Sequence, residues 1–156
     1  MILTDGIELY HASYKVIEKV DLSLCAAGKD FGQGFYVTTD YNQAGRFIRT
    51  AIGKALKNHV ENVDPETGYI SIFEYRADKV SNIKYFEFNS SDTDWLHCVV
   101  AHRKSGILKN ELEKWQDFDA IAGKIANDST NQICFRSDNA LRNLHFKGYK
   151  TVKLED

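Results

Sequence analysis

The segment from Gly28 to Tyr36 combines residue types that suit a loop in contact with a ligand. Gly32 and Gly34 lack a Cβ atom, so the backbone there can approach another molecule closely and reach positive φ angles. Tyr36 stands at the entrance of a β-type segment and offers a flat aromatic face. A tight turn into a hairpin explains the glycines equally well. The segment is not a dinucleotide-binding fingerprint, because the third glycine is missing and a strand follows instead of a helix.

The histidines and cysteines form no recognisable metal-binding pattern. Cys98 and His102 stand four residues apart, which places them on one face of a helix, but two ligands do not make a zinc site. Cys134 is embedded among apolar residues, which is typical of an inert buried thiol. We therefore expect neither a metal site nor a cysteine nucleophile.

Three stretches occur in an order that resembles the ADP-ribosyltransferase superfamily. They are Leu9 to Ser13, Phe31 to Val37 and Gln132 to Phe135. The closest branch is the one typified by diphtheria toxin and the poly(ADP-ribose) polymerases. The resemblance implies an α+β fold whose core is a split β-sheet with flanking helices.

The sequence is also similar to a bacterial family of unknown function, DUF3990, and this similarity covers most of the chain. The shared stretches are Asp30 to Tyr36, Trp95 to Arg103 and Gln132 to Leu141.

The resemblance to the transferases implies roles for individual residues toward NAD. His11 would hydrogen-bond the ribose next to adenine, and the backbone of Ala12 would meet the nicotinamide amide. Tyr36 would stack on the nicotinamide ring and Phe47 would cover its other face, since aromatic surfaces suit a flat, weakly polar ring. The implied NAD-binding residues are His11, Ala12, Gly32, Gly34, Tyr36 and Phe47.

Gln132 stands where many of these transferases carry a glutamate. That glutamate holds a ribose hydroxyl and stabilises the cation-like transition state. Glutamine keeps a hydrogen-bond acceptor but loses the charge. The implied catalytic residues are therefore His11, Tyr36 and Gln132, with slow mono-transfer or no catalysis expected in place of chain elongation. Ala44 replaces a serine that some relatives use to hold the carboxamide.

The resemblance implies an NAD-dependent mono-ADP-ribosyltransferase, such as a bacterial toxin-like effector, with NAD as a substrate. The acceptor of ADP-ribose is not identified by the sequence, and a toxin would have an antitoxin or immunity protein as its partner. The alternatives are a non-catalytic module that binds NAD or ADP-ribose, and an NAD glycohydrolase on the same fold. Arg46 and Arg49 follow the glycine loop and suit either pyrophosphate contact or solvent exposure.

Each of these residues also has a purely structural interpretation. His11 can be a satisfied structural residue of a β-segment, and Gln132 can be a polar residue at a strand edge. Tyr36 and Phe47 can be aromatic residues of the core. The order of the motifs favours the functional interpretation for His11 and Tyr36.

The elements that must position these residues are predicted from periodicity. Strands are expected at Glu8 to His11, Gly34 to Thr38, Tyr69 to Tyr75, Ile83 to Phe88, Phe118 to Ala122, Gln132 to Phe135 and Tyr149 to Leu154. A helix capped by Asp40 should bury Ala44, Phe47, Ile48, Ala51, Ile52, Ala55 and Leu56.

Three further helices are expected in the second half of the chain. One, around Asp92 to Lys104, should bury Trp95, Leu96, Val99 and Val100. A shorter one should carry Leu108, Leu112 and Trp115, and the last, capped by Ser137, should carry Leu141 and Leu144. Because strands and helices do not alternate regularly, the pattern is α+β.

The composition predicts one compact domain over residues 1–156. Hydrophobic residues make up 43% of the chain and the formal net charge is −2. This balance does not suit a disordered chain, and nucleic-acid binding is not indicated because the chain lacks a broad positive field. The odd number of cysteines (three), the absence of a signal-peptide pattern at Met1 and the lack of a long apolar run predict a cytoplasmic protein without membrane association.

Overall fold

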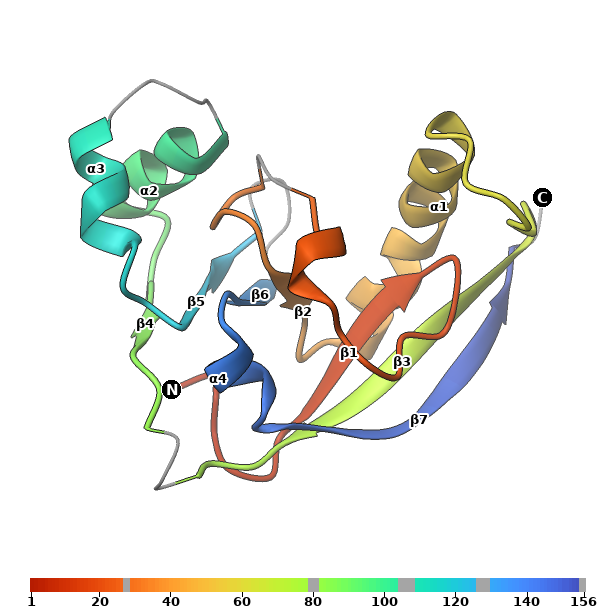
Figure 1. Cartoon of the computed structure of the whole chain (residues 1–156), viewed down its shortest axis with the longest axis horizontal. Helices are drawn as coiled ribbons and strands as arrows, with labels where there is room; N and C mark the ends of the chain where they lie inside the picture. The colour runs from red at the N-terminus through yellow and green to blue at the C-terminus, as the bar shows by residue number, and fades with distance from the viewer. Residues whose placement is uncertain (27–28, 79–81, 104–108, 126–129, 155–156) are drawn as a thin grey trace.

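The computed structural model describes residues 1–26, 29–78, 82–103, 109–125 and 130–154. In these residues the chain forms an α+β fold, as the sequence pattern predicts, and the fold comprises two β-sheets and four α-helices (Figure 1). Among the described residues, no helix combines the length and the apolar character that crossing a membrane requires.

The first sheet is antiparallel and has the order β1-β3-β7. Its strands are β1 (Glu8–Ser13), β3 (Thr67–Tyr75) and β7 (Leu144–Lys153). The second sheet has the order β2-β6-β5-β4 and comprises β2 (Phe35–Val37), β6 (Asn131–Phe135), β5 (Ala120–Lys124) and β4 (Tyr85–Glu87). Among the described strands of this sheet, β4 and β5 pair in parallel, whereas β2 with β6 and β5 with β6 pair antiparallel.

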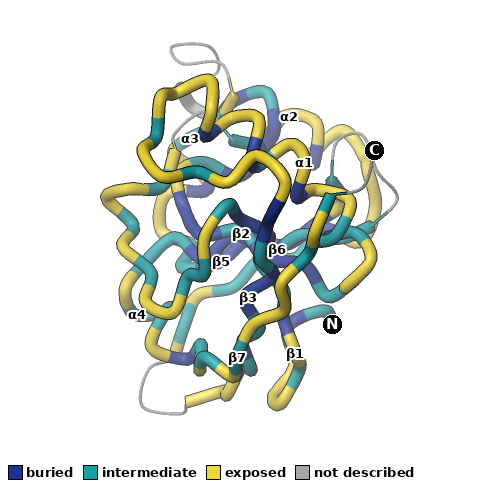
Figure 2. The backbone as a smooth tube through the Cα atoms, turned by 90° about the vertical axis from the view of Figure 1, so that its right-hand side faces the viewer, coloured by how far each residue is buried: buried dark blue, intermediate teal, exposed yellow. Residues whose placement is uncertain are grey.

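The two sheets meet where β1 lies next to β2. Tyr10 N donates to Thr38 O at 2.8 Å, and Thr38 N donates back to Tyr10 O at 2.9 Å. Beneath this junction the side chains of both sheets share one apolar core, in which Leu9, Phe35, Phe73 and Phe135 are almost entirely buried. The junction therefore connects the two sheets above a common core, and the buried strands run through the middle of the molecule (Figure 2).

Helix α1 (Tyr41–Lys57) packs on the first sheet, and its start follows the capping prediction. The Asp40 side chain accepts a hydrogen bond from Gln43 N at 3.1 Å, which satisfies one of the unpaired donors of the first turn. Ala44, Ile48 and Ile52 are buried against Ala12 and Ile70 of the sheet. The predicted apolar stripe is wrong at its edges, because Phe47 is 38% exposed and Leu56 is 44% exposed.

Helices α2 (Thr93–Arg103) and α3 (Lys109–Trp115) lie together beside the second sheet, away from α1 (Figure 1). Trp95, Cys98 and Trp115 contribute to a second core cluster with Phe31 and Ile121. The expectation that Leu96 is buried is wrong: it is 51% exposed, while Cys98, two residues later, is buried. Leu108 of the predicted short helix lies outside the described residues.

The last helix, α4 (Asp138–Leu141), is shorter than predicted. Ser137 caps it through a hydrogen bond from Ala140 N, as expected. Leu144, however, begins β7, where it pairs with Tyr75. Burial alternates from Leu144 onward, which is the two-residue period of a strand, and β7 therefore starts five residues earlier than Tyr149.

Candidate functional site

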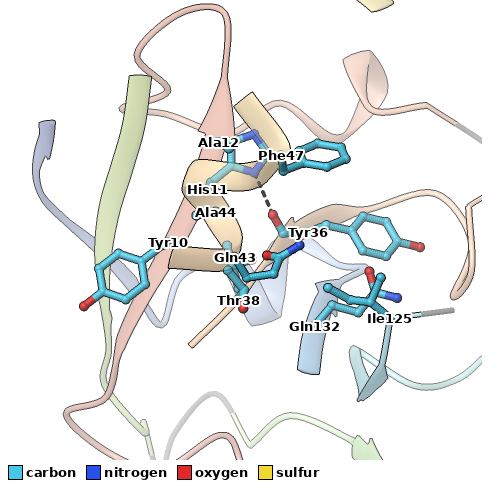
Figure 3. Close-up of a pocket in the computed structure, with 11 residues that line it drawn as sticks. Tyr10, His11, Ala12, Tyr36, Thr38, Gln43, Ala44, Phe47, Ile125 and Gln132 are labelled. Atoms are coloured by element: carbon cyan, nitrogen blue, oxygen red, sulfur yellow. Dashed lines mark hydrogen bonds between the residues drawn. The ribbon is translucent and has the colours of Figure 1, made fainter. Parts of the chain in front are cut away.

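A pocket of about 120 Å³ lies at the junction of the two sheets, next to the first turns of α1 (Figure 3). Its walls come from β1, β2, α1 and β6, together with Ile125 after β5. The lining residues are Tyr10, His11, Ala12, Tyr36, Val37, Thr38, Gln43, Ala44, Phe47, Ile125 and Gln132. Five of the residues that the sequence singled out, namely His11, Ala12, Tyr36, Phe47 and Gln132, are thus brought together from four separate elements.

The backbone of the neighbouring sheet holds the His11 side chain in the pocket wall. His11 Nδ1 lies 2.6 Å from the carbonyl oxygen of Tyr36, and its ring packs against Phe35 with centroids 4.3 Å apart. Because a carbonyl only accepts, Nδ1 carries the proton and Nε2 is the acceptor of the neutral ring. Burial lowers the pKa of His11, against the opposing effect of the Tyr36 carbonyl. The site therefore holds a neutral imidazole that can accept a hydrogen bond.

The hydroxyl of Tyr36 forms hydrogen bonds within the protein. It donates to Gly32 O at 2.6 Å and accepts from Phe31 N at 2.9 Å, so it ties the glycine loop to β2. Burial, with a further effect of Cys134, raises the pKa of Tyr36 far above its ordinary value. The tyrosine is therefore un-ionised, and what it offers to a ligand is the face of its ring.

Phe47 and Ala44 form the helix side of the pocket. In Figure 3 the rings of Phe47 and Tyr36 project in the same direction, one above the other in the view, while Tyr10 points the opposite way. Ala44 is buried and leaves a smooth apolar wall. Two aromatic side chains that line one pocket suit a flat ring, because offset-stacked and edge-to-face contacts between aromatic rings are favourable.

Gln132 has a fixed orientation because a carboxylate lies behind it. Gln132 Nε2 donates to Asp30 Oδ2 at 2.9 Å, and Asp30 Oδ1 accepts from Arg103 Nε at 2.5 Å. Asp30 is buried, with 7% of its side chain exposed, whereas Arg103 is half exposed. Since the carboxylate only accepts, the amide nitrogen of Gln132 must face it, and the amide oxygen is directed elsewhere.

Sequence reasoning gave no role to Asp30 and Arg103. The signal was weak, because an acidic residue before a glycine loop and an arginine at a helix end are both common on protein surfaces. Only the docking of α2 brings Arg103 to Asp30, 73 positions earlier in the chain. These two residues lie behind Gln132 and are not part of the pocket lining.

The glycines of the loop do not line the pocket. A Cβ at Gly34 would lie 2.4 Å from Cys134 Sγ and 2.6 Å from Phe135 O, so close packing of β2 on β6 requires glycine there. Gly32 has a φ of 88°, and a Cβ there would lie 2.9 Å from His102. Both positions are thus explained by packing and backbone conformation, and contact of these glycines with NAD stays a prediction.

The remaining candidates lie apart from the pocket lining. Arg46 and Arg49 are exposed on α1. His102 Nδ1 donates to Cys98 O at 2.7 Å, one helical turn away. Cys134 is fully buried, as predicted, and burial raises its pKa to about 12. Within the described part of the chain, no group of three or more His, Cys, Asp or Glu side chains is placed to hold a metal ion.

These features define an α+β protein with an aromatic-walled pocket at the junction of two β-sheets. Residues 7–134 match the family model described as protein of unknown function (DUF3990), and the chain belongs to this family. The matched region contains His11, Tyr36 and Gln132, together with Asp30. A comparison with curated proteins gives no match.

Proposed function

We propose that this protein is an NAD-dependent mono-ADP-ribosyltransferase that breaks the bond between nicotinamide and ribose and transfers ADP-ribose to an acceptor. The observation that carries the proposal is the convergence of His11, Tyr36, Phe47 and Gln132 on one pocket, in spite of their separation in sequence. By the resemblance of the sequence to the ADP-ribosyltransferases, these positions would correspond to the NAD-reading residues of that superfamily.

The arrangement of the strands supports the same proposal. The superfamily fold has a split sheet, and here two sheets meet next to the pocket through a local backbone bridge between Tyr10 and Thr38. An NAD-derived ring would enter between them. The pocket volume of about 120 Å³ suits the nicotinamide ring, with the rest of the dinucleotide extending along the open surface.

Each side chain has a part in binding that its chemistry allows. The ring faces of Tyr36 and Phe47 would hold nicotinamide, and His11 Nε2 would accept a hydrogen bond from a ribose hydroxyl. The amide oxygen of Gln132 would accept from the other ribose. Because burial lowers the pKa of His11, its imidazole is neutral at physiological pH and Nε2 would act as the acceptor of the ribose hydrogen bond.

In the reaction, the bond between C1′ of the ribose and the nicotinamide nitrogen breaks, and its electron pair leaves with nicotinamide. An acceptor lone pair then forms the new bond at C1′, and the acceptor loses its proton. The sugar carries positive charge between these two events, which oriented negative dipoles stabilise. The Gln132 oxygen, with the Asp30 carboxylate behind the amide, supplies such a dipole in this site.

A non-catalytic module that binds NAD or ADP-ribose is the second candidate function. The observation that favours it is Gln132 itself, because its amide is neutral and donates to Asp30. Such a module would use the same pocket as a sensor. With water as the acceptor, the same chemistry would instead make the protein an NAD glycohydrolase.

Calorimetric titration with NAD, combined with an assay of nicotinamide release, tests the proposal. We expect binding and slow release, and loss of both in His11→Ala and Tyr36→Ala. The matched controls are His145→Ala and Tyr149→Ala, two exposed positions on β7 outside the pocket. Thermal unfolding of every variant verifies that the fold persists.

The outcomes separate the candidates. Release together with labelling of an added acceptor supports the transferase, whereas release with free ADP-ribose as the only product supports the glycohydrolase. Binding without release supports the sensor. Absence of binding at millimolar NAD in the folded protein would overturn the transferase and the glycohydrolase, and absence of ADP-ribose binding as well would overturn the sensor.

A further inference from the structure

A second cavity, of about 330 Å³, lies beside the glycine loop and apart from the pocket described above. Its walls come from the loop, from α2 and α3, and from the segments that precede β5 and follow β6. The lining residues are Gly32, Gln33, His102, Leu112, Gln116, Asp117, Phe118, Asp119, Arg136 and Ser137. None of them lines the first pocket, so a molecule bound here would be a second ligand, beyond the one that the proposed function requires.

His102 brings an unsatisfied hydrogen-bond acceptor to the wall of this second cavity. Its Nδ1 donates to Cys98 O at 2.7 Å, so Nε2 of the neutral ring carries no proton and can only accept. Burial, and to a smaller extent Arg136, lower the pKa of His102 against the effect of the Cys98 carbonyl, which keeps the ring neutral. Nε2 is buried and has no hydrogen-bond partner among the described residues.

Arg136 brings an unsatisfied donor to the same wall. Its Nη1 is also buried and finds no acceptor in the described part of the chain. The carboxylate of Asp119 is engaged elsewhere, because Oδ1 accepts from Ser137 Oγ at 2.6 Å and Oδ2 accepts from Lys84 N at 2.7 Å. Solvent does not reach either orphaned nitrogen. Such groups are rare in folded proteins because they destabilise them, and two of them on one cavity require an explanation.

The two nitrogens need partners of opposite kinds. Arg136 needs an acceptor and His102 needs a donor. An anion supplies acceptors alone, and the carboxylates of Asp117 and Asp119 in the same lining disfavour it. A cation supplies donors alone. A neutral carboxamide supplies both, through its carbonyl oxygen and its amino group.

Gln33 adds a further acceptor to the lining. Its Nε2 donates to Leu22 O at 3.0 Å and to Cys25 O at 2.8 Å, which engages both protons of the amide nitrogen. The amide oxygen is therefore the end of Gln33 that remains for a ligand. With His102 Nε2 it provides two acceptors, which matches the two N–H groups of a primary carboxamide.

We propose that the second cavity binds a primary carboxamide. Its oxygen accepts from Arg136 Nη1, and its amino group donates to His102 Nε2 and to the Gln33 oxygen. Because both orphaned nitrogens are covered, binding includes a small rotation of the His102 and Arg136 side chains toward the cavity. Leu112 and Phe118 provide apolar lining for the carbon skeleton of the ligand. The carboxamide belongs either to a small molecule such as nicotinamide or to a glutamine side chain of a partner protein.

Titration of the isotope-labelled full chain with propionamide tests the assignment, with the backbone amide signals of Gly32 and Arg136 as reporters. Propionate is the matched ligand, because it has the same size but supplies only acceptors. We expect saturable shifts with propionamide and none with propionate. Binding of propionate in place of propionamide would overturn the assignment in favour of an anion site. The absence of shifts with either ligand would overturn it in favour of a cavity that holds only water.

Two variants test the residues. His102→Phe removes the acceptor and keeps an aromatic ring, and Arg136→Met removes the donor and keeps an unbranched chain. We expect each to weaken propionamide binding roughly tenfold, the effect of one hydrogen bond. His145→Phe and Arg142→Met, exposed positions outside the lining, are the matched controls and should bind as the wild type does. Because Arg136→Met removes a buried donor without a partner, it should be no less stable than the wild type in urea. Unchanged affinity in both cavity variants would overturn the assignment.

A comparison of two probes distinguishes the sources of the carboxamide. Nicotinamide and a blocked tripeptide with a central glutamine are each titrated, with the Arg136 signal as the reporter and Arg136→Met as the control. Tighter binding of nicotinamide assigns the cavity to a free small molecule, and tighter binding of the peptide assigns it to a partner protein. Carboxamide binding that depends on Arg136, in a protein that does not bind NAD, would uphold this assignment while the proposed function fails.

Discussion

The amide nitrogen of Gln132 lies 2.9 Å from Oδ2 of Asp30, although the two residues are 102 positions apart in the chain. This hydrogen bond fixes which end of the amide faces the carboxylate. It also means that the negative charge next to the pocket comes from the glycine loop, whereas β6 contributes only a neutral side chain.

Replacing Asp30 by asparagine removes the charge and leaves only one acceptor for two donors. We expect a loss of about 1–3 kcal/mol in the free energy of unfolding, because Arg103 and Gln132 can no longer both be satisfied. Nicotinamide release should fall more than NAD affinity does. Urea unfolding and single-turnover kinetics measure the two effects, and Asp117→Asn, an exposed position, is the control. An unchanged rate of nicotinamide release in a folded Asp30→Asn protein would show that the carboxylate has no part in the reaction.

Gln132→Glu should destabilise the protein at neutral pH. The variant places a second carboxylate within hydrogen-bonding distance of Asp30, and two such groups avoid simultaneous ionisation by sharing a proton. Because the folded state then binds more protons than the unfolded state, the stability deficit should shrink as the pH falls toward 5. Urea unfolding at several pH values measures this. A variant as stable as the wild type at pH 7 would contradict the close contact.

Tyr36→Phe separates the two functions of the tyrosine. The ring face remains for a ligand, whereas Phe31 N loses its acceptor and Gly32 O loses its donor. We expect a cost of about 1–3 kcal/mol in stability and NAD affinity within a few fold of the wild type. Tyr36→Ala should lose both. Equal loss of NAD affinity in the two variants would show that the hydroxyl, and not the ring, matters for binding.

Acidification should destabilise the protein through two histidines. Burial lowers the pKa of both His11 and His102 below the value of about 6.5 expected in the unfolded chain. The unfolded state therefore takes up protons first, and stability should fall as the pH drops through that value. The slope should be partly flattened in His11→Gln and in His102→Gln, and further in the double variant. Urea midpoints from about pH 7.5 to 5 measure this.

Replacing Gly34 and Gly53 by alanine, one at a time, should have opposite effects on the stability of the protein. At Gly34 the new Cβ meets Cys134 Sγ and the Phe135 carbonyl, and backbone cannot move aside cheaply, so we expect a loss of about 3 kcal/mol or more. At Gly53, in α1, nothing lies within 4 Å of the Cβ. Gly53→Ala should stabilise the protein by about 0.5–1 kcal/mol, because alanine favours the helix. Thermal unfolding compares the pair, and a tolerated Gly34→Ala would contradict the register of β2 on β6.

Local patterns predicted α1 well, because its cap and its apolar period lie within a few consecutive residues. Asp40 and Ile48 occupy the places that the pattern assigns to them. The buried face of α2 was only partly predicted. Apolar residues occur on all sides of this helix, so the helical periodicity of the sequence does not distinguish Leu96 from Cys98. Tertiary packing decides which of them is buried.

The polar contacts behind Gln132 could not be predicted from the sequence for a different reason. The bonds of Asp30 to Arg103 and to Gln132 join residues 73 and 102 positions apart, and their geometry depends on α2 and β6 meeting the glycine loop. Motif order indicated His11, Tyr36 and Gln132, and the folded chain adds Asp30 and Arg103 behind Gln132.

The seam between the sheets is held by the same residues that line the pocket. Tyr10 and Thr38 exchange two backbone hydrogen bonds, and His11 donates across the gap to the Tyr36 carbonyl. A molecule in the pocket therefore lies at the junction where the two sheets contact each other. Ligand binding and the attachment of the two sheets therefore depend on one set of contacts. A ligand that fits the pocket well should stabilise the junction between the sheets, and one that fits poorly should weaken it.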